Sequence, residues 1–271
     1  MRCISSREHP LFKKITRLQT SPAYRQIEQL ALLDGVHLIE SYLAYGGMPR
    51  SLIISESGSQ VQEIQQILDK IRSLSTQNSL DCGMFSDALF KHISSVKTPV
   101  GILALISVPP CSSIGSTQDC SFGVILEAIQ DPGNLGSILR SAAAAGVSDV
   151  FLSADCADCW SPKTLRAGMG AHFHLRLHED TDLLKLAEDY DGEIVAATLY
   201  DAVPVYLINL CEPVIFAFGN EGNGLSEALL KRINKRVKVV MPGKAESLNV
   251  AAAAAVCLFE RVRQMQLQIP S

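Results

Sequence analysis

Short apolar runs alternate with amphipathic stretches along most of this 271-residue chain. Five runs in its second half have the length and apolar character of buried strands. They are FGVILEAI (122–129), DVFLSAD (149–155), EIVAATL (193–199), VIFAF (214–218) and VKVVM (237–241). Helix-like stretches separate these runs. Strands that alternate with helices predict an α/β fold with a mostly parallel sheet, covered by helices on both faces.

The first hundred residues show the same alternation. Helices are expected over 11–19, 23–35, 36–45, 60–74 and 87–94, and strands over 50–55 and 101–108. The stretch PPCSSIGSTQDC (109–120) is rich in Pro, Ser and Gly, which is typical of an exposed linker. We therefore expect a small N-terminal α/β domain over residues 1–108, a linker over 109–120 and a second domain over 121–271.

Polar residues mark the starts of two helices in the second half. Asn134 follows a turn at Asp131-Pro132-Gly133 and is expected to cap the next helix, in which Arg140 points away from the apolar face. Ser226 is expected to cap the helix SEALLKRI.

The last helix is expected to open at SLN (247–249) and is rich in alanine. Small side chains allow another element to pack closely, either in the core or across a dimer. The apolar face is expected at Ala252, Ala255, Phe259 and Val262.

Charge is unevenly distributed along a chain whose formal net charge is −4. Residues 1–30 carry six Lys or Arg against two Glu, a local excess of 6 − 2 = +4. Lys13, Lys14 and Arg17 fall mainly off the apolar stripe of their helix and so face outward. Charge alone favours a solvated amphipathic helix, and a phosphate-binding surface is the alternative.

The eight cysteines are too few and too scattered for a disulfide scaffold. No apolar run reaches the length of a signal peptide core or a membrane span, so we expect a cytoplasmic protein that does not bind membranes. Cys156 and Cys159 form a single C-x-x-C without a second pair. His172 and His174 alternate as on one face of a strand. Neither pair has further ligands nearby, and no metal site is expected.

Three glycines, Gly219, Gly222 and Gly224, follow the run VIFAF within six residues. Glycines allow close backbone approach and positive φ angles, which suits a bound nucleotide-like ligand as well as a purely structural turn. A Walker loop is excluded because no lysine precedes Ser226, and the G-x-G-x-x-G fingerprint is absent. Glu221 would repel a phosphate, so it is expected to pair with an arginine or to contact a cation or hydroxyl.

Three stretches together resemble the SpoU (TrmH-like) family of RNA ribose 2′-O-methyltransferases, part of the SPOUT class. They are NLGSILRSAAAAGV (134–147), GNEGNGLS (219–226) and PGKAESLNVAAAAAV (242–256). RLQTSPAYRQIEQLALLDGVHLIE (17–40) is similar to the substrate-binding domain often attached to these enzymes, with Asp34-Gly35 where Glu-Gly is usual. Ala251 departs from the family, in which serine is common at this position.

The resemblance implies a C-terminal trefoil knot, S-adenosylmethionine bound by the knot loops, and a homodimer that completes each site. By match to the motifs, the residues expected to hold the cofactor are Thr198, Leu199, Gly219, Asn220, Gly224, Met241 and Leu248. The functional polar positions are Asn134, Arg140, Glu221, Ser247 and Asn249. The N-terminal cations Lys13, Lys14 and Arg17 would then bind RNA phosphates.

The resemblance implies methyl transfer to a ribose 2′-hydroxyl, which makes RNA and not DNA the substrate. We expect ribosomal RNA, with a 23S-type guanosine as target. The alternatives are a transfer RNA 2′-O-methyltransferase and a non-catalytic RNA-binding protein with the same fold.

Overall fold

The computed structural model describes residues 3–45, 47–74, 81–109 and 120–267. Contacts divide the chain into two compact units. Unit 1 comprises Met1–Pro110 with Asp158–Phe173, and unit 2 comprises Cys111–Ala157 with His174–Ser271. The predicted linker lies outside the described residues except for Pro109 and Cys120. The domain boundaries at residues 108 and 121 stay predictions.

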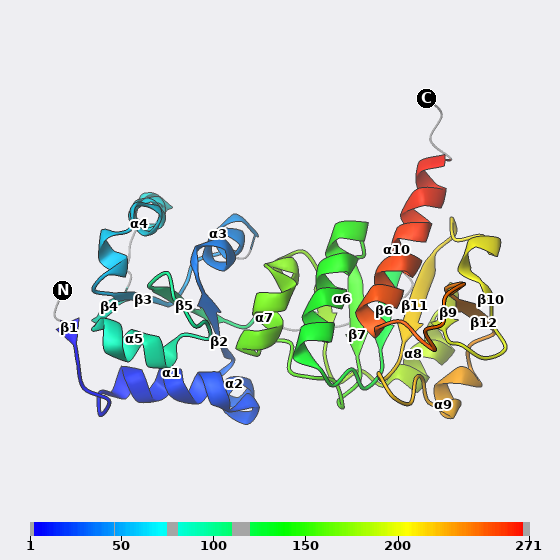
Figure 1. The fold of residues 1–271 in the computed structure, drawn as a ribbon, viewed down its shortest axis with the longest axis horizontal. Coiled ribbons are helices and arrows are strands. Elements are labelled where there is room, and N and C mark those ends of the chain that lie inside the picture. Colours follow the sequence, from blue (N-terminus) through cyan, green and yellow to red (C-terminus); the bar gives the residue numbers. More distant parts are fainter. Residues whose placement is uncertain (1–2, 46, 75–80, 110–119, 268–271) are drawn as a thin grey trace. The chain divides into compact units, whose positions relative to one another are not determined.

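Unit 1 contains a five-stranded mixed sheet (Figure 1). Its order is β1 (Cys3–Ile4), β4 (Asp81–Phe85), β3 (Ser51–Ser55), β5 (Ile102–Ser107) and β2 (Leu30–Asp34). β5 runs antiparallel to both of its neighbours, whereas β4 pairs in parallel with β1 and β3.

Helices cover both faces of this sheet (Figure 1). The buried side chains of α1 (Pro10–Thr20) and α5 (Asp87–Ile93) join one core with the sheet. α3 (Val36–Tyr45) and α4 (Gln62–Leu74) lie on the opposite face. The remaining helical segments are α2 (Pro22–Glu28), η1 (Gly58–Gln60), α7 (Pro162–Gly168) and η3 (Ala171–Phe173).

The helix predicted over 23–35 is wrong in its second half. α2 ends at Glu28, Gln29 adopts a left-handed conformation (φ 52°), and Leu30–Asp34 forms β2. The first four residues of β2 are buried, and the strand pairs with β5. A short apolar run cannot be assigned to helix or strand from periodicity alone, so the available partner strand decides.

Unit 2 contains a seven-stranded sheet in which every adjacent pair is parallel. Its order is β10 (Val203–Pro204), β12 (Lys235–Lys238), β9 (Glu193–Ala197), β11 (Val214–Phe218), β6 (Phe122–Leu126), β7 (Asp149–Leu152) and β8 (Arg176–His178). The predicted α/β class with mostly parallel sheets is confirmed. The short edge strand β10 was not predicted, and β8 begins later than the strand expected around His172 and His174.

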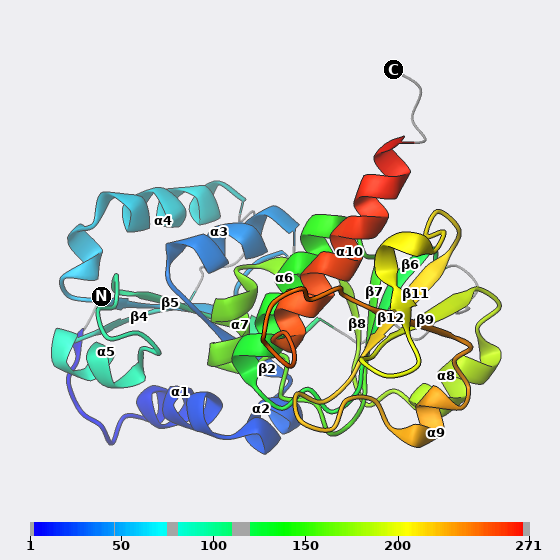
Figure 2. The same ribbon diagram turned by 45° about the vertical axis from the view of Figure 1, so that its right-hand side comes forward.

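Two layers of helices enclose this sheet (Figure 2). α6 (Pro132–Ala145) and α10 (Val250–Leu267) pack against each other, and α10 also contacts β9 and β11. α8 (Leu183–Asp189) and α9 (Glu227–Leu230) share a separate core with the other face of the strands. The short helix η4 (Val205–Leu207) contacts α10.

Several predicted boundaries and faces in the second half are wrong. The run 122–129 stops being a strand at Leu126, and the last strand spans Lys235–Lys238 instead of 237–241. α10 begins at Val250 and buries Ala254, Cys257 and Leu258, whereas Ala252 and Phe259 are exposed. The predicted apolar face failed because α6 covers a different side of an alanine-rich helix.

His172 and His174 do not alternate along one strand. His172 lies in η3, and its ring contacts the carbonyl oxygen of Cys159 at 2.9 Å. The strand starts later, at Arg176. In the ranges that the structure describes, no helix has both the length and the apolar character to span a bilayer.

Candidate active site

The loops that follow β9, β11 and β12 converge on one cavity of about 340 Å³ at the carboxyl ends of these strands. In parallel α/β sheets, ligands bind at this edge. The predicted site residues that line the cavity are Thr198, Leu199, Gly219, Asn220, Glu221, Gly224, Met241, Ser247 and Leu248.

The turn after β11 folds back on itself. The backbones of Asn220 and Gly224 exchange two hydrogen bonds, at 3.0 and 2.9 Å. A Cβ atom on Gly219 would lie 2.2 Å from the carbonyl carbon of Gly224, and Gly224 itself has φ +69°. Any side chain at Gly219 would therefore collide with the backbone of the turn, and Gly224 has a φ that favours glycine.

One wall of the cavity is apolar. Phe218, Leu225, Val237, Ala253 and Cys257 contribute to it. Burial raises the pKa of the Cys257 thiol to about 12, so this side chain is uncharged at neutral pH. These residues were not predicted as part of the site. Their only signal in the sequence is membership of strands or helices, since they come together through packing.

A chain of side-chain hydrogen bonds links the three candidate motifs. The Asn134 amide donates to Glu221 Oε1 at 3.0 Å, and Asn134 Oδ1 accepts from the Asn249 amide at 2.9 Å. Asn249 Oδ1 accepts from the backbone N–H of Ala251 at the start of α10. Because the Glu221 carboxylate only accepts, these contacts determine the orientation of both amides.

Glu221 is held as a carboxylate. Burial would raise its pKa, but hydrogen bonds from Asn134 and from backbone amides at the start of α6 outweigh that effect and lower the pKa. The backbone donors are the N–H groups of Gln130, at 3.4 Å, and Asp131, at 3.3 Å. A negative charge is stabilised at a helix N-terminus. In the described structure the partners of Glu221 are amides, so the predicted arginine is not among them. Contact with a cation or hydroxyl stays a prediction.

Asn134 does not cap α6. Asp131 is the N-cap, and its side chain accepts from the backbone N–H of Asn134 at 2.9 Å. The Asn134 side chain is thereby free to connect Glu221 with Asn249. The cap of α9 is as predicted, since Ser226 accepts from the N–H of Leu229.

Arg140 is exposed on α6 and does not line the cavity. It lies about 9 Å along the helix from Asn134 and about 120° around it. Within the described part of the chain, its guanidinium forms no hydrogen bond or ion pair. The structure therefore brings Asn134 and Asn249 to Glu221 at the cavity, but leaves Arg140 outside it.

Residues 121–259 match the model of the family described as the SpoU rRNA Methylase family. The chain belongs to the SpoU rRNA methylase family. The family resemblance that three motifs indicated is confirmed.

Named relatives share nearly the full length of this SpoU family member. An uncharacterised tRNA/rRNA methyltransferase of Synechocystis sp. is 35% identical over 96% of this chain and 93% of its own. The 23S rRNA (guanosine(2553)-2′-O)-methyltransferase RlmP of Bacillus subtilis is 30% identical over 96% of this chain and 98% of its own. The AdoMet-bound rRNA methyltransferase of Sinorhizobium meliloti superposes with a TM-score of 0.82 at 25% identity, covering 97% of this chain and 98% of that one.

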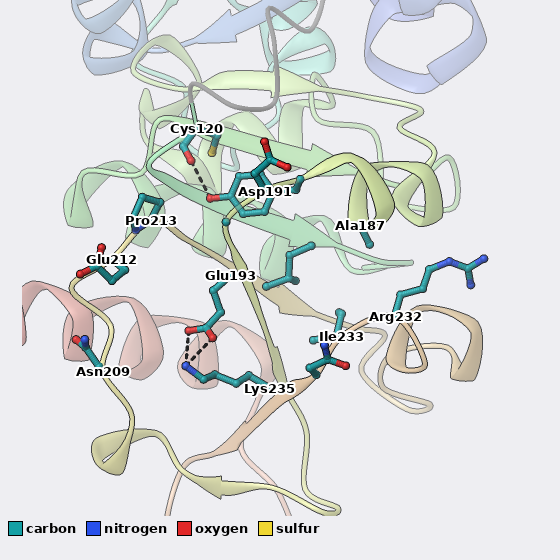
Figure 3. Close-up of a pocket in the computed structure, with 14 residues that line it drawn as sticks. Cys120, Ala187, Asp191, Glu193, Asn209, Glu212, Pro213, Arg232, Ile233 and Lys235 are labelled. Atoms are coloured by element: carbon teal, nitrogen blue, oxygen red, sulfur yellow. Dashed lines mark hydrogen bonds and ion pairs between the residues drawn. The ribbon is translucent and has the colours of Figure 1, made fainter.

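Unit 2 of this SpoU methylase has a second, larger cavity of about 760 Å³ (Figure 3). It lies at the amino ends of β9, β11 and β12, and no predicted site residue lines it. Lys235 pairs with Glu193 at 2.6 Å (Figure 3). The hydroxyl of Tyr190 donates to the carbonyl oxygen of Cys120 at 2.8 Å. The smaller cavity is the candidate active site because it contains the motif residues at the ligand-binding edge of the sheet.

The predicted RNA-binding cations lie on α1 in unit 1, and each has a partner. Lys13 pairs with Glu8 and Lys14 with Glu28, and the Arg17 guanidinium lies 4.4 Å from the centre of the Tyr24 ring. Among the described residues, no group of three or more His, Cys, Asp and Glu has an arrangement that could hold a metal ion.

Proposed function

We propose that this SpoU family protein transfers the methyl group of S-adenosylmethionine to a ribose 2′-hydroxyl of ribosomal RNA. The observation that carries the proposal is the convergence of the loops after β9, β11 and β12 on one cavity, beside the Glu221–Asn134–Asn249 chain. RlmP of B. subtilis is named for this reaction on a 23S rRNA guanosine, and that target class is the one we propose here.

The cavity suits S-adenosylmethionine. It combines the closely packed backbone at Gly219 with an apolar wall and an adjacent carboxylate. We assign binding through the backbone to Gly219, Met241 and Leu248, with Asn220 and Gly224 shaping the turn and the Thr198–Leu199 loop next to the adenosyl group. The cofactor, when bound, supplies an already activated methyl group, so the protein must mainly align donor and acceptor.

The side chains then have separate tasks. Asn134, held between Glu221 and Asn249, positions the target nucleotide, and Ser247 contributes a hydroxyl at the cavity. Arg140 binds the adjacent phosphate and stabilises the negative charge that develops on the 2′-oxygen. It is not a general base, because a guanidinium does not lose its proton in proteins.

RNA contact by unit 1 is part of the same proposal. Only ribose offers a 2′-hydroxyl, and Lys13, Lys14 and Arg17 are exposed or partly exposed on one helix. Glu8 and Glu28, which pair with Lys13 and Lys14, reduce the positive potential of this helix. We therefore assign the three cations a modest share of phosphate binding.

A homodimer completes the site in our proposal. Exposed apolar side chains lie on the loop after β9, on η4 and on α10, and η4 contacts α10. They include Leu199, Tyr200, Tyr206, Leu207, Phe259 and Leu267. A partner at this surface would cover them and could bring its own groups to the cavity.

The proposal further includes a C-terminal trefoil knot and a cytoplasmic location. The knot fits a chain that crosses from β11 beyond β9 to form β12 and then returns as α10 to contact β11. The location suits the free thiols of the described cysteines, since disulfides are rare in that compartment.

The test is methyl transfer from labelled S-adenosylmethionine to RNA from cells that lack the protein. We expect label in ribosomal RNA at a ribose 2′-oxygen. Arg140→Ala should lower turnover at least about 100-fold while leaving cofactor affinity nearly unchanged, because Arg140 lies outside the cavity. Isothermal titration calorimetry measures the affinity.

Lys185→Ala is the matched control, since it removes an exposed cation on the opposite helical layer. Its activity should equal that of the wild type. Wild-type turnover by Arg140→Ala would overturn the role of Arg140. Label in transfer RNA alone would change the substrate class, and RNA binding without any methyl transfer would favour a non-catalytic protein.

A further inference from the structure

Glu127 follows β6 directly and holds both ends of the turn 219–226 that lines the cavity. Its backbone N–H donates to the carbonyl oxygen of Phe218, the last residue of β11, at 3.0 Å. Its carboxylate accepts from the backbone N–H and from the hydroxyl of Ser226, both at 2.7 Å. A residue just after the neighbouring strand β6 therefore contacts the turn where it begins and where it ends.

The turn makes contacts in the opposite direction as well. The Asn220 amide donates to the carbonyl oxygen of Ala128 at 2.9 Å, and Glu221 accepts from the backbone of Gln130 and Asp131. The loop after β6 and the turn after β11 are thus connected by side chains from both sides. Ala128, between these contacts, has a φ of 53°, a conformation that non-glycine residues seldom adopt without support.

We infer that Glu127 is a positioning residue for the cofactor, which acts by keeping the turn 219–226 in its binding conformation. The inference rests on the proposed function. Glu127 does not line the cavity, so it acts through Ser226 and the turn and not by direct contact. Hydrogen bonds to a carboxylate are about twice as strong as neutral ones.

The energetic argument is one of preorganisation. A ligand that binds one conformation loses affinity in proportion to the population of that conformation. Gly219, Gly222 and Gly224 allow this turn many conformations, so contacts from outside add to the hydrogen bonds that Asn220 makes within the turn. Removal of the Glu127 carboxylate should weaken cofactor binding and leave the chemistry of the bound complex intact.

The experiment compares Glu127→Ala, Glu127→Gln and Glu212→Ala in the full chain. Glu212 is an exposed carboxylate just before β11, at the opposite end of the strand. We expect Glu127→Ala to raise the Kd and KM for S-adenosylmethionine about tenfold, with kcat at saturating cofactor changed less than about twofold. Glu127→Gln, which keeps an oxygen for the Ser226 N–H, should show a smaller rise, and Glu212→Ala none.

A double-mutant cycle of Glu127→Ala with Ser226→Ala tests whether Glu127 acts through Ser226. If Glu127 acts through Ser226, the double variant should bind only slightly more weakly than Glu127→Ala, whereas additive losses would overturn the inference. Wild-type Kd in Glu127→Ala, or a fall in kcat with unchanged KM, would overturn it as well. Where Glu127→Ala does not fold, Glu127→Gln decides by the same criteria. A wild-type protein without measurable cofactor binding would instead contradict the proposed function itself.

Discussion

Single side chains in this protein take roles that depend on their surroundings more than on their type. Asp131 caps α6, so that Asn134 three residues later is free to connect Glu221 with Asn249. His172 is a second case. It is buried against Trp160, with ring centres 5.4 Å apart, and its Nε2 contacts the carbonyl oxygen of Cys159. Its Nδ1 has no hydrogen-bond partner among the described residues. The proton of the neutral ring therefore belongs on Nε2, which can donate it to the Cys159 carbonyl.

His172 should make the stability of unit 1 depend on pH. Burial lowers its pKa to about 4 from 6.5. The folded state therefore favours the neutral ring, and its stabilising effect is complete above pH 6.5. It is lost as the pH falls from 6.5 to about 4, by up to about 3 kcal/mol in the free energy of unfolding.

Urea unfolding followed by the fluorescence of Trp160, the single tryptophan, measures this effect. His172→Gln retains a donor for Cys159 without a titrating ring, and should lack this part of the pH dependence. An identical pH dependence in both proteins would mean that other groups cause it.

At the level of helices and strands, the glycine turn shows which glycines the geometry requires. Gly219 has no space for a Cβ atom, since the backbone of Gly224 lies against it. The nearest atom that a Cβ on Gly222 would meet lies 3.5 Å away, an ordinary contact. The sequence predicted a glycine-rich turn but could not show which of the three glycines is required. That depends on the pairing of Asn220 with Gly224, which only the structure shows.

Gly219→Ala should therefore disrupt the turn, whereas Gly243→Ala should not. Gly243 lies in the loop between β12 and α10, where a Cβ atom would meet nothing within 4 Å and φ is not positive. We expect cofactor affinity to fall at least about 100-fold in Gly219→Ala, because the backbone must move to avoid the overlap. Gly243→Ala should stay within about 0.5 kcal/mol of wild-type stability and bind normally. Calorimetric titration measures the cofactor affinity of both variants. Equal affinities would refute the steric argument for Gly219.

At the scale of the whole molecule, unit 2 has exposed apolar residues that the proposed active site does not account for. Leu207 is 77% exposed on η4, which contacts α10, and Phe259 of α10 is 46% exposed. The apolar face predicted for the last helix is thus partly at the surface. In the proposed homodimer, the same residues would be buried by the partner.

Leu207→Glu should dissociate the dimer, because burying an unpaired carboxylate in an apolar interface is costly. Sedimentation velocity should show a rise of about tenfold or more in the dimer dissociation constant, with methyl transfer falling in parallel. Ile27→Glu on α2 is the control, since Ile27 is 78% exposed in unit 1 and its replacement should change neither quantity. A wild-type protein that sediments as a monomer would refute the homodimer.

Local patterns were enough to find most helices, the five predicted strands of unit 2 (with wrong boundaries for β6 and β12) and the three motifs that identify the family. Periodicity and turn chemistry depend on a few neighbouring residues, so they can be recognised in a short segment without the rest of the chain. The strand β2, the edges β8 and β10 and the buried face of α10 required partners distant in the chain, because burial depends on what packs against a segment. The same holds for the site. The motifs named Glu221, Asn134 and Asn249, but the hydrogen bonds that join them, and the hold of Glu127 on Ser226, exist only where parallel strands end side by side.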